Sequence, residues 1–327
     1  MPSPPPDTRR IRHRAHRRSW NLAGRTAGLA ARASAVLLVG CVAAAALTPA
    51  LPTAASAAES RALETRTASA GDGVSFDPGF IISDDNFYDS NTMTALQIQS
   101  FLRAQACIPK DPVPCLADFR QTTVSQPAEF AHCAPYAGAR SERASAIIAK
   151  VATACGISPR VLLVLLQKEQ SLVTRPSRYG YQRATGYACP DTAECDTKYF
   201  GFFNQVYSAA WQFREYSASS DWRYHVGAVQ VQYSPNLACG SAIVTIRNQA
   251  TANLYNYTPY QPNPDTLATP TASPTACSTY GNLNFFRIYT QWFGDPTQHS
   301  LPDWWGRCLL YIGGYDCPTD PTAVSMP

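Results

Sequence analysis

The chain has 327 residues, of which 45% are hydrophobic and 15% are charged. This hydrophobic content is ordinary for a globular protein and argues against wholesale disorder. The formal net charge of +4 comes from the first 57 residues, which hold eight arginines against Asp7, whereas the rest carries 19 basic and 22 acidic residues. Such a chain lacks the basic surface that binds DNA or RNA, so we expect no nucleic-acid partner.

Residues 1–57 have the three parts of a secretory signal peptide. An arginine-rich start precedes the apolar run 33–47, and small residues follow it and end at Ala57. We therefore predict cleavage after Ala57 and a protein that is secreted or associated with the cell wall. The apolar run is shorter than the roughly 20 residues of a bilayer span. A membrane link is left only through an uncleaved signal or through lipid attachment at Cys41.

The cysteine count agrees with export. Ten cysteines follow the signal, and an even number in an oxidising compartment predicts disulfides. Pairing each cysteine with its neighbour gives Cys107–Cys115, Cys133–Cys155, Cys189–Cys195, Cys239–Cys277 and Cys308–Cys317. The absence of a Cys-x-x-Cys motif disfavours a zinc site, and no phosphate loop or dinucleotide fingerprint is present. We expect neither a metal nor a cofactor.

The first predicted elements follow a small, polar linker at residues 58–75. Residues 76–135 form an N-terminal lead-in segment with one helix, preceded by an extended stretch at 76–92. The helix begins at Thr94, because Thr94 and Gln97 have the spacing of a capping box. Its apolar side consists of four residues: Leu96, Ile98, Phe101 and Leu102.

Residues 136–296 form the predicted main domain. Ser141 caps a helix that Gly156 ends, and Ser158 with Pro159 starts the next, over 159–173. Six consecutive apolar residues, 161–166, leave that helix without a polar face, so it is expected in the core. Further helices are predicted from Asn204 or Gln205, over 248–257 and over 282–293. Residues 224–246 form a hairpin, and 262–280 a loop.

The predicted tail, residues 297–327, is aromatic and contains the last cysteine loop. The elements together predict a mainly α fold with a small β-hairpin, an α+β class, held by disulfides.

Glu169 is the main candidate for chemistry. It lies near the end of the buried helix, and its helical neighbours are leucines: Leu162, Leu165, Leu166 and Leu172. Burial among them would raise the pKa of the carboxyl, which could then donate a proton near neutral pH, as cleavage of a glycosidic bond requires. The alternative is a structural glutamate, solvated or paired with Lys168 or Arg175.

Three short motifs carry a resemblance to a known superfamily. The core helix ends in Glu169-Gln170-Ser171, and an Ala-x-x-Tyr-Asn segment ends at Asn256. Between them, Gly201–Val206 forms a turn of the Gly-hydrophobic-x-Gln-Val kind that holds one residue more between Gly and Gln than is usual. In this order they resemble the lysozyme-like superfamily, in particular lytic transglycosylases and goose-type lysozymes, over about 141–293. The two strings at 159–173 and 201–212 are also similar to exported actinobacterial proteins labelled hemagglutinin-like or uncharacterised.

The resemblance implies a lysozyme-like catalytic domain at 136–296 and a role for each matching residue. Glu169 matches the catalytic acid and Ser171 the serine that hydrogen-bonds to it. Gln205 matches the glutamine that lines the cleft, and Tyr255 with Asn256 matches the pair beside the N-acetyl group. The chain departs from the pattern at Asp196–Phe200, where the family has Ala-x-Gly. Separately, the loop residue Tyr187 is a candidate for stacking against sugar rings.

The resulting expectation is a secreted enzyme that cleaves peptidoglycan, a glycosidase or lytic transglycosylase acting on the MurNAc–GlcNAc bond through Glu169. A second carboxylate would distinguish hydrolase from lyase. The candidates are Asp191, Glu194, Asp196 and Asp221. The rival hypothesis is a secreted protein that binds the cell wall or another polysaccharide without cleaving it.

Overall fold

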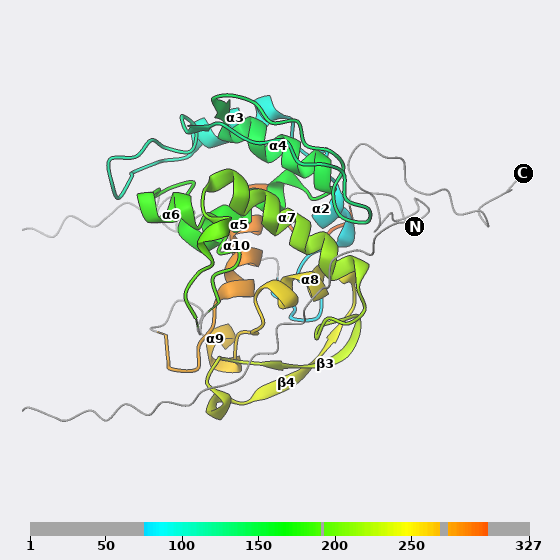
Figure 1. Cartoon of the computed structure of the whole chain (residues 1–327). Helices are drawn as coiled ribbons and strands as arrows, with labels where there is room; N and C mark the ends of the chain where they lie inside the picture. The colour runs from blue at the N-terminus through cyan, green and yellow to red at the C-terminus, as the bar shows by residue number, and fades with distance from the viewer. Residues whose placement is uncertain (1–74, 191–192, 269–273, 300–327) are drawn as a thin grey trace, which may run out of the picture. The chain divides into compact units, whose positions relative to one another are not determined.

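The computed structural model describes residues 75–190, 193–268 and 274–299, and these belong to one compact unit (Figure 1). The predicted signal peptide, Cys41, nearly all of the linker and the Cys308–Cys317 pair lie outside these residues. None of the helices in the described ranges is long and apolar enough to cross a membrane.

The N-terminal segment contains two helices, α2 (Asp84–Tyr88) and α3 (Ala95–Ala104). The capping box at α3 is confirmed: the Thr94 side chain accepts from the backbone N–H of Gln97, and the Gln97 side chain accepts from that of Thr94. Helix α2 differs from the expected extended stretch. Ser83 caps it by accepting a hydrogen bond from the Asn86 N–H, which satisfies one of the free donors at a helix start.

A small strand pair precedes the first helix of the main domain. Strand β1 (Arg120–Gln121) pairs antiparallel with β2 (Glu142–Arg143), and α4 (Ala144–Cys155) follows directly. The predicted cap Ser141 was wrong: Arg143 occupies the N-cap position, because the pairing of β2 holds the chain extended up to that residue. Gly156 ends α4 in the left-handed conformation, as predicted.

Helix α5 (Pro159–Gln170) is the predicted core helix. Its residues 161–166 are at most 1% exposed, and it packs against α4 and against α10 (Gly281–Phe293), as Figure 1 shows. The helix ends three residues earlier than expected, because Ser171 adopts φ 54° and donates its backbone N–H to the carbonyls of Leu166 and Gln167.

The chain between α5 and the hairpin is more helical than expected. It forms α6 (Arg178–Gln182), the 3₁₀ turn η1 (Thr197–Tyr199) and α7 (Phe202–Ala218). Helix α7 begins two residues before the predicted Asn204, directly after Gly201, whose φ of 102° suits glycine. Helix α8 (Gln249–Tyr257) packs against α7 and starts after the cap Asn248.

The predicted hairpin is confirmed. Strands β3 (Gly227–Gln232) and β4 (Ser241–Ile246) pair antiparallel, with Val229 opposite Val244, and the 3₁₀ turn η2 (Leu237–Cys239) lies between them. The expected loop at 262–280 also contains a short helix, α9 (Pro264–Ala268). In Figure 1 the hairpin lies below α8, on the side away from α3 and α4.

One hydrophobic core joins the N-terminal segment to the main domain. Ile81, Phe87 and Ile98 belong to the same buried cluster as residues of α5 and α7. The mainly helical α+β class is therefore confirmed. Four predicted disulfides are confirmed as well: Cys107–Cys115, Cys133–Cys155, Cys189–Cys195 and Cys239–Cys277.

Candidate functional site

Glu169 lies in the last turn of α5, where the helix leaves the core. Its side chain is 24% exposed, whereas the Lys168 side chain beside it is 7% exposed. Lys168 Nζ donates to Glu169 Oε1 and also to Thr258 Oγ1, at 2.9 Å. The alternative pairing with Lys168 is thus present, and Lys168 joins the end of α5 to the segment after α8.

The second oxygen of Glu169 lies against a loop whose backbone conformation favours glycine. Gly186 has φ +72°, and a Cβ built on it would lie 3.3 Å from Glu169 Oε2. Glycine both tolerates this backbone conformation and leaves room for the carboxylate. The loop around Gly186 therefore forms one wall of the site.

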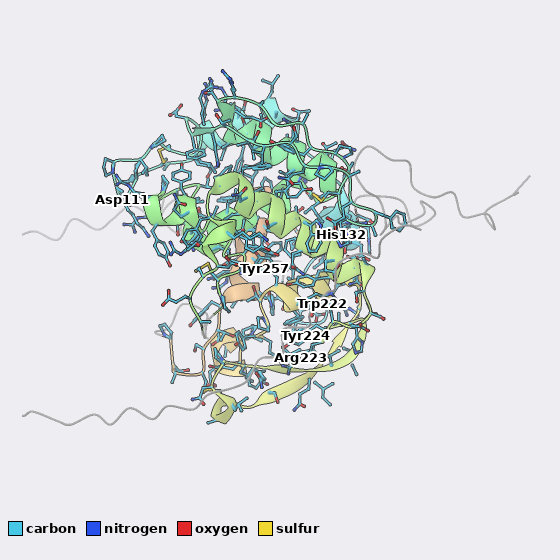
Figure 2. All side chains as sticks on the ribbon, viewed as in Figure 1. Asp111, His132, Trp222, Arg223, Tyr224 and Tyr257 are labelled. Atoms are coloured by element: carbon cyan, nitrogen blue, oxygen red, sulfur yellow. A yellow bond between two sulfur atoms is a disulfide. The ribbon has the colours of Figure 1, made fainter. Side chains whose placement is uncertain are left out.

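Tyr257, at the C-terminal end of α8, lies close to the same carboxylate. Its hydroxyl donates to the backbone carbonyl of Thr185 at 2.8 Å. Burial raises the pKa of the Tyr257 phenol well above its usual value, and the charge of Glu169 adds to the effect. Figure 2 shows Tyr257 among the central helices, near α8 and α7. It stays protonated over the physiological range and acts here as a hydrogen-bond donor.

Gln205 does not line a cleft; its buried side chain holds the backbone of the loop that contains Gly186. It is fully buried on α7, and its Oε1 accepts from the backbone N–H groups of Thr185 and Tyr187 at 3.3 and 3.1 Å. Its Nε2 donates to the carbonyls of Tyr187 and Tyr199 at 3.0 and 2.9 Å. Both the oxygen and the nitrogen of the amide are thus hydrogen-bonded to the backbone of the loop, so Gln205 positions the loop that lies against Glu169.

Tyr255 and Asn256 do not join Glu169. The Tyr255 side chain is fully buried, and its hydroxyl donates to the carbonyl of Pro78 at 2.9 Å. Asn256 exchanges two hydrogen bonds with the backbone of Tyr224, at 3.1 and 2.8 Å. Both residues therefore fasten α8 to its surroundings, and the α8 tyrosine whose ionisation responds to the charge of Glu169 is Tyr257.

Ser171 contributes its backbone to the site. It forms the left-handed C-cap of α5, and its carbonyl accepts from the N–H groups of Thr174 and Arg175, at 3.1 and 2.7 Å. This turn is what ends the helix directly after Glu169 and Gln170. Tyr187, one residue after Gly186, lines a cavity that also borders α7.

Sequence reasoning missed Gly186 and Tyr257 as neighbours of Glu169. A glycine within a loop gives no sign of which side chain it faces. The Tyr-Asn pair drew attention to Tyr255, although Tyr257 lies only two positions further along the same helix. The angular step of a helix puts positions two apart on different faces, and only packing decides which face meets Glu169.

The second carboxylate remains a prediction. Glu194, Asp196 and Asp221 are exposed, and Asp196 caps η1 by accepting from the Lys198 N–H at 3.0 Å. Asp191 lies outside the described residues. Across the described ranges, no group of three or more His, Cys, Asp or Glu side chains is placed to hold a metal ion.

In a comparison with protein families, residues 80–304 match the model described as LasA, N-terminal domain. The match covers more than half of the chain and spans both the N-terminal segment and the main domain. Neither the curated proteins nor the solved structures give a significant match.

Proposed function

This chain belongs to the family of the LasA N-terminal domain, and we propose that it cleaves glycosidic bonds of peptidoglycan with Glu169 as the acid–base group. The observation that carries the proposal is the placement of Glu169. A carboxylate emerges, 24% exposed, from the end of a helix whose residues 161–166 are buried, and it lies against a glycine loop. Such a group is held in one position and can still reach a substrate.

The proposed chemistry uses the two oxygens of Glu169 differently. Lys168 occupies Oε1, so Oε2 is the oxygen that meets the substrate beside Gly186. A protonated Oε2 would give its proton to the glycosidic oxygen between MurNAc and GlcNAc. The resulting carboxylate would then stabilise the positive charge that develops on the sugar, and Lys168 and Tyr257 keep the site in position.

The resemblance to the lysozyme-like superfamily supports this proposal at the level of motifs. The proposal includes a lysozyme-like fold for residues 136–296. It also includes a location outside the cell, on or near the wall. The four disulfides are consistent with an oxidising compartment. The substrate partner is peptidoglycan or another polysaccharide.

Digestion of purified peptidoglycan by the oxidised protein tests the proposal, with the products identified by mass spectrometry. Because general acid–base groups contribute roughly 10²–10⁴-fold, we expect Glu169→Gln to lower the cleavage rate by at least about 100-fold. Anhydro-MurNAc ends would identify a lytic transglycosylase, and reducing ends a muramidase. Asp118→Asn, which changes an exposed carboxylate elsewhere, serves as the control. Equal cleavage by wild type and Glu169→Gln would contradict the proposal.

A second candidate function is glycan binding without cleavage. The ion pair between Lys168 and Glu169 favours it, because a paired carboxylate at a helix end also has a purely structural explanation. Under this hypothesis, wild type and Glu169→Gln both sediment with peptidoglycan, and neither releases soluble products.

A further inference from the structure

The cavity that Tyr187 lines lies beside the loop of the proposed site and borders the first half of α7. It has a volume of about 470 Å³, which is within the range of ligand pockets. Its walls come from three parts of the chain: residues 126–129 of the N-terminal segment, the loop and turn that carry Tyr187 and Tyr199, and the first half of α7. Nothing in the chemistry proposed for Glu169 uses it.

Aromatic rings form much of the cavity wall. Tyr187 and Tyr199 meet edge to face with their ring centroids 4.9 Å apart, and Tyr207 and Trp211 face the cavity from α7. Flat rings of this kind stack against the apolar C–H face of a pyranose ring, and the tyrosine hydroxyls can bond to its rim. The wall therefore suits a sugar.

Polar side chains of both hydrogen-bonding types complete the lining. Gln126, Asn204 and Ser208 are neutral, and one acid, Glu129, and one base, Lys198, accompany them. A sugar presents many hydroxyls and few charges, which this set matches. A peptide stem that carries several carboxylates would require more cations than Lys198 alone supplies.

The cavity is held in shape before any ligand binds. The indole N–H of Trp211 donates to Glu129 Oε2 at 2.8 Å, and the His132 ring stacks on Trp211 with centroids 4.4 Å apart and planes 9° apart. Figure 2 labels His132 on the loop beside α7. On the opposite wall, Gln205 holds the backbone of Tyr187 and Tyr199. Preorganised walls lower the entropic cost of binding.

The cavity and the proposed site share one loop. Tyr187 lines the cavity, and a Cβ built on the preceding residue, Gly186, would lie 3.3 Å from Glu169 Oε2. We propose that this cavity is a saccharide-binding site that holds sugar units of the glycan strand next to Glu169, with the N-terminal segment as one wall. This inference rests on the proposed glycan substrate but not on catalysis by Glu169.

The test is titration calorimetry of the full oxidised protein carrying Glu169→Gln, with the β-1,4-linked tetramer of N-acetylglucosamine as probe. Added to this background, Ser208→Trp fills the cavity from α7 and Tyr199→Ala removes a ring from the opposite wall. We expect each to weaken binding at least tenfold. Tyr233→Ala, a half-buried tyrosine beside the hairpin, is the matched control and should bind as before. Circular dichroism and thermal melting establish that every variant is folded.

Three outcomes would overturn the inference: no binding of the tetramer, unchanged affinity in a folded Ser208→Trp variant, or binding of a free stem tetrapeptide in place of the sugar. Failure of the proposed function has a different signature. In that case wild type does not cleave peptidoglycan, yet the tetramer still binds and Ser208→Trp still prevents it.

Discussion

At the scale of single residues, the site depends on three residues that lie around one carboxylate. Lys168, Gly186 and Tyr257 surround Glu169 and come from a helix, a loop and a second helix. The sequence identifies Glu169 as a candidate because a charged residue follows an apolar helix. It does not identify the other two, because their proximity depends on how α8 and the loop pack against α5.

Gly186→Ala tests the contact between the loop and the carboxylate. The left-handed backbone costs an alanine roughly 1–2 kcal/mol, and the added Cβ would meet Glu169 Oε2. We expect a lower melting temperature and at least a tenfold loss of peptidoglycan cleavage. Gly240→Ala is the control, because Gly240 also has positive φ, +77°, but nothing lies within 4 Å of its Cβ position. If both variants lose cleavage activity, backbone strain would explain the loss, and the contact with Glu169 would not.

Glu142 makes stability depend on pH. Burial opposes ionisation of its carboxyl, but hydrogen bonds from Lys150, Thr123 and Tyr136 outweigh burial and lower its pKa below the ordinary 4.5. A lowered pKa in the folded state gives stability that is present above pH 4.5 and is lost as the pH falls through the folded-state pKa.

We therefore expect Glu142→Gln to lower the melting temperature at pH 7 and to have a progressively smaller effect below pH 4.5. Thermal melts of both proteins across this pH range measure the difference. A gap that stays constant down to the most acidic pH would contradict the assignment.

At the scale of elements, α7 organises the site from behind. The Gln205 side-chain amide forms hydrogen bonds with backbone groups of Thr185, Tyr187 and Tyr199. These bonds satisfy loop backbone groups that no neighbouring strand pairs with. The sequence predicts α7 because apolar residues recur on one face of that helix, and the weak alternation over 224–246 is enough to indicate the hairpin. It does not predict α2, α6 or α9, which are each five residues long, since so short a helix depends on caps and tertiary packing.

Gln205→Leu should loosen this loop. The change leaves several buried backbone groups without a partner, and each such group costs about 1–3 kcal/mol. We expect faster hydrogen exchange at the Tyr187 amide, which now donates to Gln205, together with a lower free energy of unfolding. Gln230→Leu on the exposed side of β3 should change neither quantity. Unchanged exchange at Tyr187 would show that the loop is held by other contacts.

At the scale of the whole molecule, the N-terminal segment and the main domain share one hydrophobic core within the described residues. The predicted division at residue 135 marks where the resemblance to the lysozyme-like superfamily begins, because its motifs lie later in the chain. The family match begins at residue 80, and the shared core includes Ile81 and Ile98. The boundary of a resemblance is therefore not the boundary of the core.

Substitutions at two residues of α3 test whether the main domain depends on the N-terminal segment for its stability. Ile98 is fully buried and Leu96 is 81% exposed, although the sequence placed both on the apolar side of the helix. Ile98→Ala should lower the free energy of unfolding by about 2–5 kcal/mol, and the whole described unit should melt earlier in a single transition. Leu96→Ala should have little effect. Separate melting of the N-terminal segment in the Ile98 variant would show two independent units.

The disulfide connectivity has a consequence for how the chain matures. Within the described ranges, each bridge joins a cysteine to the next one along the chain. A polypeptide that enters an oxidising compartment with its N-terminus first can thus close each of these four bridges before the following cysteine arrives. Order of arrival selects these four pairings, so they should form without the slow thiol–disulfide reshuffling that interleaved pairings require.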